Sequence, residues 1–174
     1  TETAMRDAIR EAKDGVWTYE VRNDGPQEIG GEVVVKATVT ISGDRVSVDY
    51  DGSSDQVNLA INTVLNYTKA YSAYALKSLF APWIPNNEGA FLPISVTAPE
   101  GSILNPIRPA AVGARGMIGH LLPPAIFGAL AEALGDRTQA APGSPSNNIQ
   151  ISALSGKKRY AVNAFLGAGQ GGGA

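Results

Sequence analysis

The 174-residue sequence contains no cysteine and a single histidine, His120. The lack of cysteine excludes disulfide bonds, thiolate metal ligands and a cysteine nucleophile, and it fits a reducing compartment. The first residues are polar and charged, unlike a secretory signal peptide. No apolar run approaches the roughly 20 residues that a membrane-spanning helix requires. We therefore expect a cytoplasmic protein without a membrane partner.

Charge is scarce as well. Asp, Glu, Lys and Arg make up 17% of the residues, whereas an average soluble domain has about 25%. The net charge of −2 gives no long-range field that would attract nucleic acid or an anionic membrane. A surface with so little charge is typical of one that another domain or subunit partly covers.

The length of the chain suits one domain with a hydrophobic core. It begins at Thr1, directly inside a helical pattern, and closes with a glycine-rich run at 167–174. We therefore predict a single domain over residues 1–174 that is a fragment of a longer enzyme and has no self-sufficient active site.

Apolar periodicity indicates an α+β fold with a mostly antiparallel sheet, whose β-hairpins pack against two or three helices. We expect helices over 3–13, 59–80 and 113–134, the last one interrupted at Pro123 and Pro124. We expect strands over 16–21, 32–41, 45–50, 91–98, 149–154 and 159–165, with hairpin turns at 42–44 and 155–158.

Few residues carry recognisable chemistry. His120 lies among apolar neighbours without metal-ligand spacing, which favours a packing or hydrogen-bonding role. Asp49 and Asp51 are two apart at a strand end, so their carboxylates can face one cation or proton-transfer site. The alternative, which we prefer, is a polar strand end running into an Asp-Gly turn.

Other sequence motifs lack the flanking residues or elements that their chemistry requires. Residues 167–172 formally match G-x-G-x-x-G, but no helix follows to hold a phosphate. Ser102, Ser144 and Ser146 lie outside any G-x-S-x-G elbow, and the sequence has no Walker-type lysine motif. What remains is a series of polar loops at 86–89, 99–102 and 144–148, with Asn62 early in the predicted helix 59–80. The polar residues of each segment either stabilise a turn or belong to a binding surface.

These segments occur in an order that resembles one family. They are residues 48–54 (VDYDGSS), Asn62, residues 84–94 (IPNNEGAFLPI), 99–106 (PEGSILNP), 109–115 (PAAVGAR) and 128–131 (GALA). They resemble corresponding motifs of the hydantoinase B/oxoprolinase family, and PEGSILNP matches the family's P-E-G-S-l-l-N-P almost letter for letter. The resemblance runs over nearly the whole chain, since Met5-Arg6 and Asp14-Gly15 also have counterparts.

The resemblance implies a piece of the B-type subunit of an ATP-dependent cyclic-amide hydrolase, the group that includes N-methylhydantoinases and 5-oxoprolinases. In these enzymes an A-type partner binds ATP and phosphorylates the substrate, and the B-type part handles the activated intermediate. Phosphorylation turns the amide oxygen into a leaving group, so water can open a poorly reactive ring. The implied partners are an A-type subunit, the remainder of the B-type subunit and a small cyclic amide.

The resemblance also implies where cofactors bind. The family's divalent-metal motifs lie upstream of the region matched here, and ATP lies on the partner subunit, so this segment alone is expected to bind neither and to be inactive. In one place the chain departs from the pattern. Leu121 and Pro124 stand where we expect an arginine and an aspartate, which indicates an altered or specialised copy.

We infer seven substrate-binding or site-shaping candidates and assign no catalytic residue: Asp49, Asp51, Asn62, Asn87, Glu100, Arg115 and Asn147. Their expected roles are polar recognition and loop positioning, without nucleophilic attack or metal binding. Two alternatives stay open. The chain can belong to a related ATP-dependent acetone- or acetophenone-type carboxylase, or it can be a non-catalytic module for subunit assembly.

Overall fold

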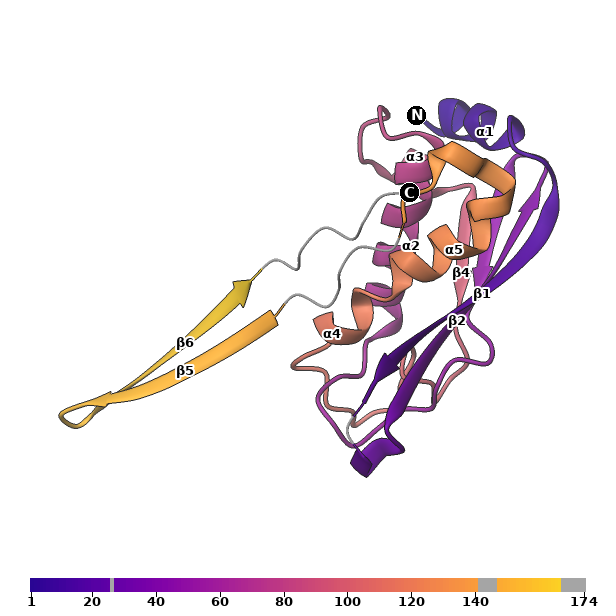
Figure 1. Cartoon of the computed structure of the whole chain (residues 1–174). Helices are drawn as coiled ribbons and strands as arrows, with labels where there is room; N and C mark the ends of the chain where they lie inside the picture. Colours follow the sequence, from indigo (N-terminus) through magenta and orange to yellow (C-terminus); the bar gives the residue numbers. More distant parts are fainter. Residues whose placement is uncertain (26, 141–146, 167–174) are drawn as a thin grey trace.

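A computed structural model describes residues 1–25, 27–140 and 147–166 of the chain. Its main sheet has the order β1-β2-β3-β4, formed by β1 (Gly15–Asp24), β2 (Glu32–Ser42), β3 (Arg45–Asp49) and β4 (Ile94–Thr97). The first three strands pair antiparallel, and β4 runs parallel to β3. The helices lie on one face of this sheet (Figure 1). This arrangement confirms the predicted α+β class.

The core forms where alternating strand residues meet the helices. Val33, Val35, Ala37, Val39 and Ile41 point from β2 into the core and are almost completely buried, while their neighbours in sequence are partly exposed. A period of two places such residues on one face of a strand. The hairpin between β2 and β3 is present as predicted, but its turn has two residues in place of the expected 42–44, because Ser42 already pairs with Arg45.

The N-terminal elements differ from the prediction only at their ends. Helix α1 (Glu2–Arg10) stops earlier than expected, and its buried residues are Met5, Ala8 and Ile9. Strand β1 continues to Asp24, beyond the expected end at residue 21, because each residue keeps a partner on β2. A short 3-10 helix, η1 (Gln27–Ile29), then leads into β2.

The prediction of a helix over 59–80 is wrong in its first third. Helix α2 spans Leu65–Phe80. Residues 57–64 form an irregular loop instead, because their polar groups bond to the segment 103–114 and to the Asn62 side chain, and not to one another in helical register. The hydroxyl of the buried Tyr50 forms a 2.7 Å hydrogen bond with Ser72 Oγ, which ties the middle of α2 to the sheet.

The expected strand over 91–98 also begins too early. A short helix, α3 (Glu88–Phe91), comes first, and β4 covers only Ile94–Thr97. The Asn87 side chain caps α3 by accepting a hydrogen bond from the Ala90 N–H at 3.2 Å. Such a cap favours a helical turn over an extended strand at this point.

The helical region after residue 113 consists of two segments, as predicted, α4 (Gly116–Gly119) and α5 (Leu122–Leu134). The break lies before the prolines, which occupy the first turn of α5, where the missing N–H has no intrahelical partner to lose. Gly135 ends α5 with a φ of 52°, and η2 (Gly135–Arg137) follows.

The stretch Gly116–Arg137 has the length and composition of a membrane span, contrary to the expectation that no apolar run is long enough. Its mean hydropathy is 1.4 over the most apolar window, and 56% of that window is buried inside the fold. Helix α5 packs on β1, β2 and α2. The stretch is therefore a core element, whose apolar residues face the sheet.

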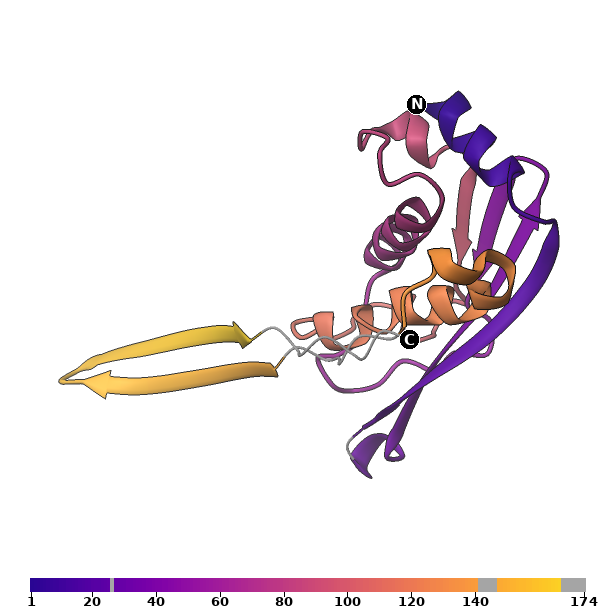
Figure 2. The ribbon, with the colours of Figure 1, turned by 45° about the horizontal axis from the view of Figure 1, so that its top comes forward.

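The second predicted hairpin is present as β5 (Asn147–Ser155) and β6 (Lys158–Leu166). It forms a separate two-stranded sheet. Figures 1 and 2 show it projecting from the four-stranded part of the molecule. Residues 1–140 are called the body, and Asn147–Leu166 are called the arm.

Candidate functional site

Two loops lie side by side at the edge of the sheet where the parallel strands β3 and β4 both end. They are residues 50–64 and 98–115, which contain most of the distinctive motifs. Backbone hydrogen bonds join them, from Gln56 N–H to the Gly101 carbonyl at 2.8 Å and from Thr63 N–H to the Ile103 carbonyl at 2.8 Å. These two loops form one layer, because each supplies the backbone partners of the other.

Asn62 holds this loop layer together. Its side chain is fully buried. Its Oδ1 accepts from the Val57 N–H at 2.9 Å, and its Nδ2 donates to three carbonyls, those of Val57, Leu59 and Ala111, at 2.7–3.0 Å. Asn62 therefore positions the loops. It lies ahead of α2, not inside the helix as the sequence indicated, and all its polar atoms are satisfied within the protein.

The Pro-Glu-Gly-Ser motif forms a tight turn within this layer. Gly101 has a φ of 87°, a conformation that costs little only for glycine. The buried Ser102 donates from Oγ to the Pro99 carbonyl at 2.7 Å. Asn105 Nδ2 donates to the Ala98 carbonyl at 3.0 Å and closes the turn. Glu100 is left exposed at its tip.

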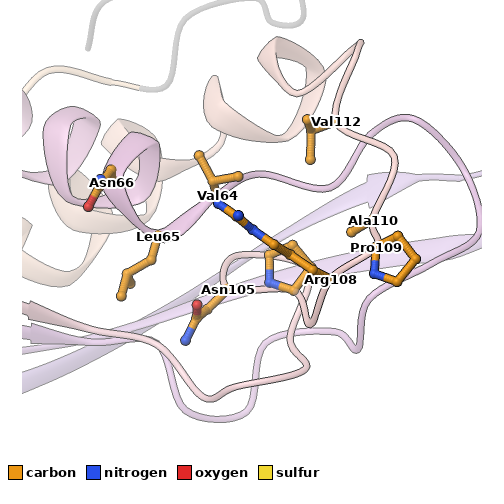
Figure 3. Close-up of a pocket in the computed structure, with 9 residues that line it drawn as sticks. Val64, Leu65, Asn66, Asn105, Arg108, Pro109, Ala110 and Val112 are labelled. Carbon is orange, nitrogen blue, oxygen red and sulfur yellow. The ribbon is translucent and has the colours of Figure 1, made fainter.

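A pocket of about 820 Å³ opens between this layer and the first turn of α2. Its walls carry Val64, Leu65, Asn66, Asn105, Pro106, Arg108, Pro109, Ala110 and Val112. Figure 3 shows the Arg108 side chain reaching from one wall toward Val64 on the other. Arg108 is the only ionisable residue among those lining residues. The pocket therefore combines apolar walls with one cation and two amide side chains, a composition suited to a small polar ligand with negative charge.

An aromatic cluster lies beside the pocket, where α2 passes α4. The rings of Tyr67 and Tyr71 stack with centroids 4.5 Å apart. The Arg115 guanidinium lies 5.7 Å from the centre of the Tyr67 ring, at a distance typical of a cation–π contact. His120 meets Tyr71 edge to face at 6.4 Å. The α4 backbone approaches closely, because a Cβ at Gly119 would overlap the Tyr67 ring.

The environment of Tyr67 favours its neutral form. Desolvation raises the pKa of the hydroxyl above the ordinary value of a tyrosine, and the side-chain hydrogen bond with Tyr71 raises it further. The Arg115 charge acts in the opposite direction and is the weakest of these effects. At neutral pH Tyr67 is therefore a hydrogen-bonding group and not a base.

The two aspartates at the end of β3 take different places. Asp49 Oδ1 accepts hydrogen bonds from the Asp51 N–H at 3.3 Å and from Thr97 Oγ1 at 3.0 Å. Asp51 lies in the following turn and is exposed. Neither residue lines the pocket at α2. Their contacts agree with the polar strand end and Asp-Gly turn that we preferred.

The remaining candidates are spread over the molecule. Arg115 lies on the rim of the pocket, where its Nη1 donates to the carbonyl of the lining residue Val112 at 3.3 Å. Asn87 caps α3, beyond the opposite end of α2. Asn147 begins β5 in the arm, with its backbone paired to Leu166, and its side chain lies outside the described residues. The loops 86–89 and 99–102 thus belong to two different ends of the body.

Sequence reasoning missed Arg108, Asn66 and the tyrosine pair as site residues. The signal for Arg108 was its position between Pro106 and Pro109, in a loop where an exposed cation has no helical or strand role. Tyr67 and Tyr71 share one face of α2 through their i, i+4 spacing, but that spacing is equally typical of core residues. Leu121 and Pro124, the two departures from the family pattern, are buried at the junction of α4 and α5.

The described residues do not fit a metal centre. Within residues 1–25, 27–140 and 147–166, no three His, Cys, Asp or Glu side chains lie close enough together to hold an ion. His120, the side chain with the best metal affinity, contacts the aromatic ring of Tyr71. No chemical step is therefore assigned to a metal bound by this segment.

Comparison with known proteins identifies relatives along the whole chain. The profile of the family described as hydantoinase B/oxoprolinase matches residues 1–174. A protein of Pseudomonas sp. (strain NS671), named as the B-type subunit of a D-/L-hydantoinase, is 32% identical over 168 residues, which cover 90% of this chain and 28% of that protein. An uncharacterised protein of Methanocaldococcus jannaschii is 31% identical over 138 residues, covering 79% of this chain and 24% of that protein.

Solved structures show the same fold. The crystal structure of the ATP-dependent caprolactamase from Pseudomonas jessenii superposes with a TM-score of 0.79 and 27% identity, covering 92% of this chain and 28% of that one. Nucleotide-free acetone carboxylase also reaches 0.79, at 17% identity over 93% of this chain and 24% of that one, and this likeness concerns the fold alone. The chain spans about a quarter of the length of these relatives. It belongs to the hydantoinase B/oxoprolinase family.

Proposed function

We propose that this chain is part of the B-type subunit of an ATP-dependent cyclic-amide hydrolase, which opens hydantoin- or 5-oxoproline-type rings through a phosphorylated intermediate. The match to the family over all 174 residues carries this proposal. The likeness to a caprolactamase supports it, because caprolactam is a cyclic amide and that enzyme is described as ATP-dependent. In this proposal an A-type partner supplies ATP, and the metal lies in a part of the subunit outside this segment.

The pocket at the start of α2 is the part of this segment that we assign to the substrate. A phosphorylated amide carries negative charge, and Arg108 places a guanidinium at the pocket, where it can bind two phosphate oxygens at once. Asn66 and Asn105 offer amide groups for the carbonyl and N–H of the ring. The apolar walls remove water from the ligand and strengthen these contacts.

The neighbouring residues have positioning roles in this proposal. Asn62 fixes the loop layer, and so sets the distance between the Arg108 wall and the first turn of α2. Tyr67 keeps its proton and orients Arg115 at the rim through the cation–π contact. Glu100 lies on the same turn as Asn105, and its exposed carboxylate is available for recognition of a ligand or a partner.

The test is coupled turnover by the complete B-type subunit together with its A-type partner. ADP release and ring-opened product are measured for the wild type, for Arg108→Ala, and for Arg137→Ala as a control. Among the described residues, the one ion pair of Arg137 is an exposed contact with Glu11 at 3.4 Å. We expect Arg108→Ala to lower turnover about 10- to 100-fold, because a charge-assisted contact to an anion is lost. The control is expected to stay within about twofold.

Full turnover by both Arg108→Ala and Arg115→Ala would reject the substrate role and favour a non-catalytic module for subunit assembly. The second enzymatic candidate is an ATP-dependent carboxylase, which the shared fold with acetone carboxylase keeps open. A requirement for bicarbonate in ATP turnover would favour the carboxylase. ADP release that depends on a cyclic amide and not on bicarbonate supports the hydrolase.

A further inference from the structure

The arm has one apolar face, and the strand register creates it. The cross-strand pairs Ile149–Ala164, Ile151–Val162 and Ala153–Tyr160 alternate with Gln150–Asn163, Ser152–Ala161 and Leu154–Arg159, each of which contains at least one polar residue. Because residues two apart on a strand point the same way, the apolar pairs gather on a single face. A slip of either strand by one residue would mix the two faces, so the register matters for the pattern.

This apolar face is exposed in the single chain. Ile151, Tyr160 and Val162 are 58%, 52% and 59% exposed. Figure 2 shows the arm extending away from the body, without a helix or strand against it. An isolated two-stranded sheet is marginally stable in water, and it needs a surface to pack on. The pattern therefore calls for a covering partner.

The body presents an edge that can receive such a hairpin. Strand β1 is the outermost strand of its sheet and pairs only with β2 among the described strands. Between β1 and α5 lies a groove of about 940 Å³, with apolar side chains from Tyr19, Val21, Phe127 and Ala131 on its walls. A free strand edge of ten residues is a template for an added strand.

Charge favours the same pairing. All 16 acidic residues lie in the body, together with 11 of the 14 Lys and Arg, so the body carries a net charge of −5. The arm carries +3, from Lys157, Lys158 and Arg159, and contains no Asp or Glu. Glu20, Arg22 and Asp136 line the groove, and Arg22 pairs with Glu20 at 3.0 Å, which leaves Asp136 as the acidic lining residue without a lining cation beside it in these contacts. A basic hairpin is thus attracted mainly by the net negative charge of the body.

We propose that the arm of one copy docks in the β1–α5 groove of a second copy of this chain. Its apolar face packs toward α5, and one of its strands extends the main sheet along the free edge of β1. The basic turn at 156–158 then lies near acidic side chains of the second copy. The occupant is a second copy because both complementary surfaces are on this chain. This inference does not depend on the proposed enzymatic activity.

Sedimentation of the 174-residue chain over a range of concentrations tests the proposal. We expect concentration-dependent dimers, whose dissociation constant rises at least about tenfold in Val162→Asp, because a charge enters the apolar face. Ser152→Asp makes the same charge change on the opposite face of the arm and is expected to retain dimers. Raising the salt concentration is expected to weaken the association, since part of the attraction is electrostatic.

Because Val162→Asp can also unfold the arm, Ala131→Arg provides a second test on the body. Ala131 is exposed and lines the groove, so an arginine there fills the docking site and repels the basic arm without disturbing the core. The proposal predicts loss of dimers in this variant as well. A wild-type chain that stays monomeric at every concentration overturns it. Dimers that survive Ala131→Arg overturn it equally.

Discussion

Strand β2 in the body and the two strands of the arm follow the same rule of alternating apolar and polar residues. In β2 the apolar residues are almost completely buried, because α5 packs on that strand and α2 packs in turn on α5. In the arm the equivalent side chains are more than half exposed at Ile151 and Val162. An alternating pattern therefore specifies a strand with an apolar face, but whether that face is covered depends on other elements. Substitutions in the two regions measure the difference.

The largest expected effect comes from a matched pair of isoleucines. Ile41→Ala in β2 removes a buried side chain and leaves a cavity, so we expect a loss of about 2–5 kcal/mol in the free energy of unfolding of the body. Ile151→Ala in the arm is expected to change it by less than about 0.5 kcal/mol. Urea unfolding followed by tryptophan fluorescence reports the body, since Trp17 and Trp83 both lie there. Equal losses would contradict the separation of body and arm.

The loop layer provides the next test. Asn62→Ala leaves the Val57 N–H and three carbonyls without their partner, so we expect the body to lose about 2–3 kcal/mol. Asn66→Ala, at an exposed position in the first turn of α2, is the control and should change the unfolding free energy by less than about 0.5 kcal/mol. Amide hydrogen exchange should show faster exchange of Gln56 and Thr63 only in Asn62→Ala.

Alanine substitutions at two glycines with positive φ, one in the body and one in the arm, are expected to give a smaller difference in stability. Gly101 in the loop layer and Gly156 in the turn of the arm have φ angles of 87° and 61°. Alanine at either position costs about 1–2 kcal/mol in the left-handed region. Gly101→Ala should lower the urea midpoint of the body, whereas Gly156→Ala should leave it unchanged and only speed amide exchange in the arm. A lower body midpoint in both variants would show that the two regions unfold together.

The smallest expected effect depends on pH. Burial raises the pKa of the Tyr50 hydroxyl, and the hydrogen bond with Ser72 offsets this only in part. An unfolded tyrosine ionises near pH 10. The stability that comes from keeping Tyr50 protonated in the folded state is therefore present below about pH 10 and is lost as the pH rises further. Tyr50→Phe should cost about 1 kcal/mol at pH 8 through the lost hydrogen bond.

Above pH 10 the same variant should lose less stability than the wild type, so the difference between the two narrows or reverses. Urea unfolding of the wild type and of Tyr50→Phe at pH 8 and above pH 10 measures this difference in unfolding free energy. The pKa of Tyr67 is also raised, so the unfolding free energy of Tyr50→Phe is still expected to fall somewhat above pH 10. A difference that stays constant with pH would contradict the buried, protonated state of Tyr50.

Both hairpins, the α+β class, the break near the prolines and the family were predictable from the sequence, because each depends on local periodicity, turn residues or a specific motif such as PEGSILNP. Prediction failed where partners are distant in sequence. Residues 57–64 leave the helical pattern because Asn62 bonds to the carbonyl of Ala111, 49 positions away. No local pattern predicts such a contact.

The same limit applies to the candidate site. Glu100 and Arg115 were inferred from motifs, and the fold places them on one loop layer, whereas Asn87 and Asn147 lie elsewhere. Arg108, Asn66 and Asn105 share a pocket only because the loop 98–115 crosses the start of α2. The sequence by itself determined the strands of both hairpins and the turns between them, since these follow from backbone and side-chain preferences. Only the tertiary structure decided which of them meet, because packing joins segments that are far apart along the chain.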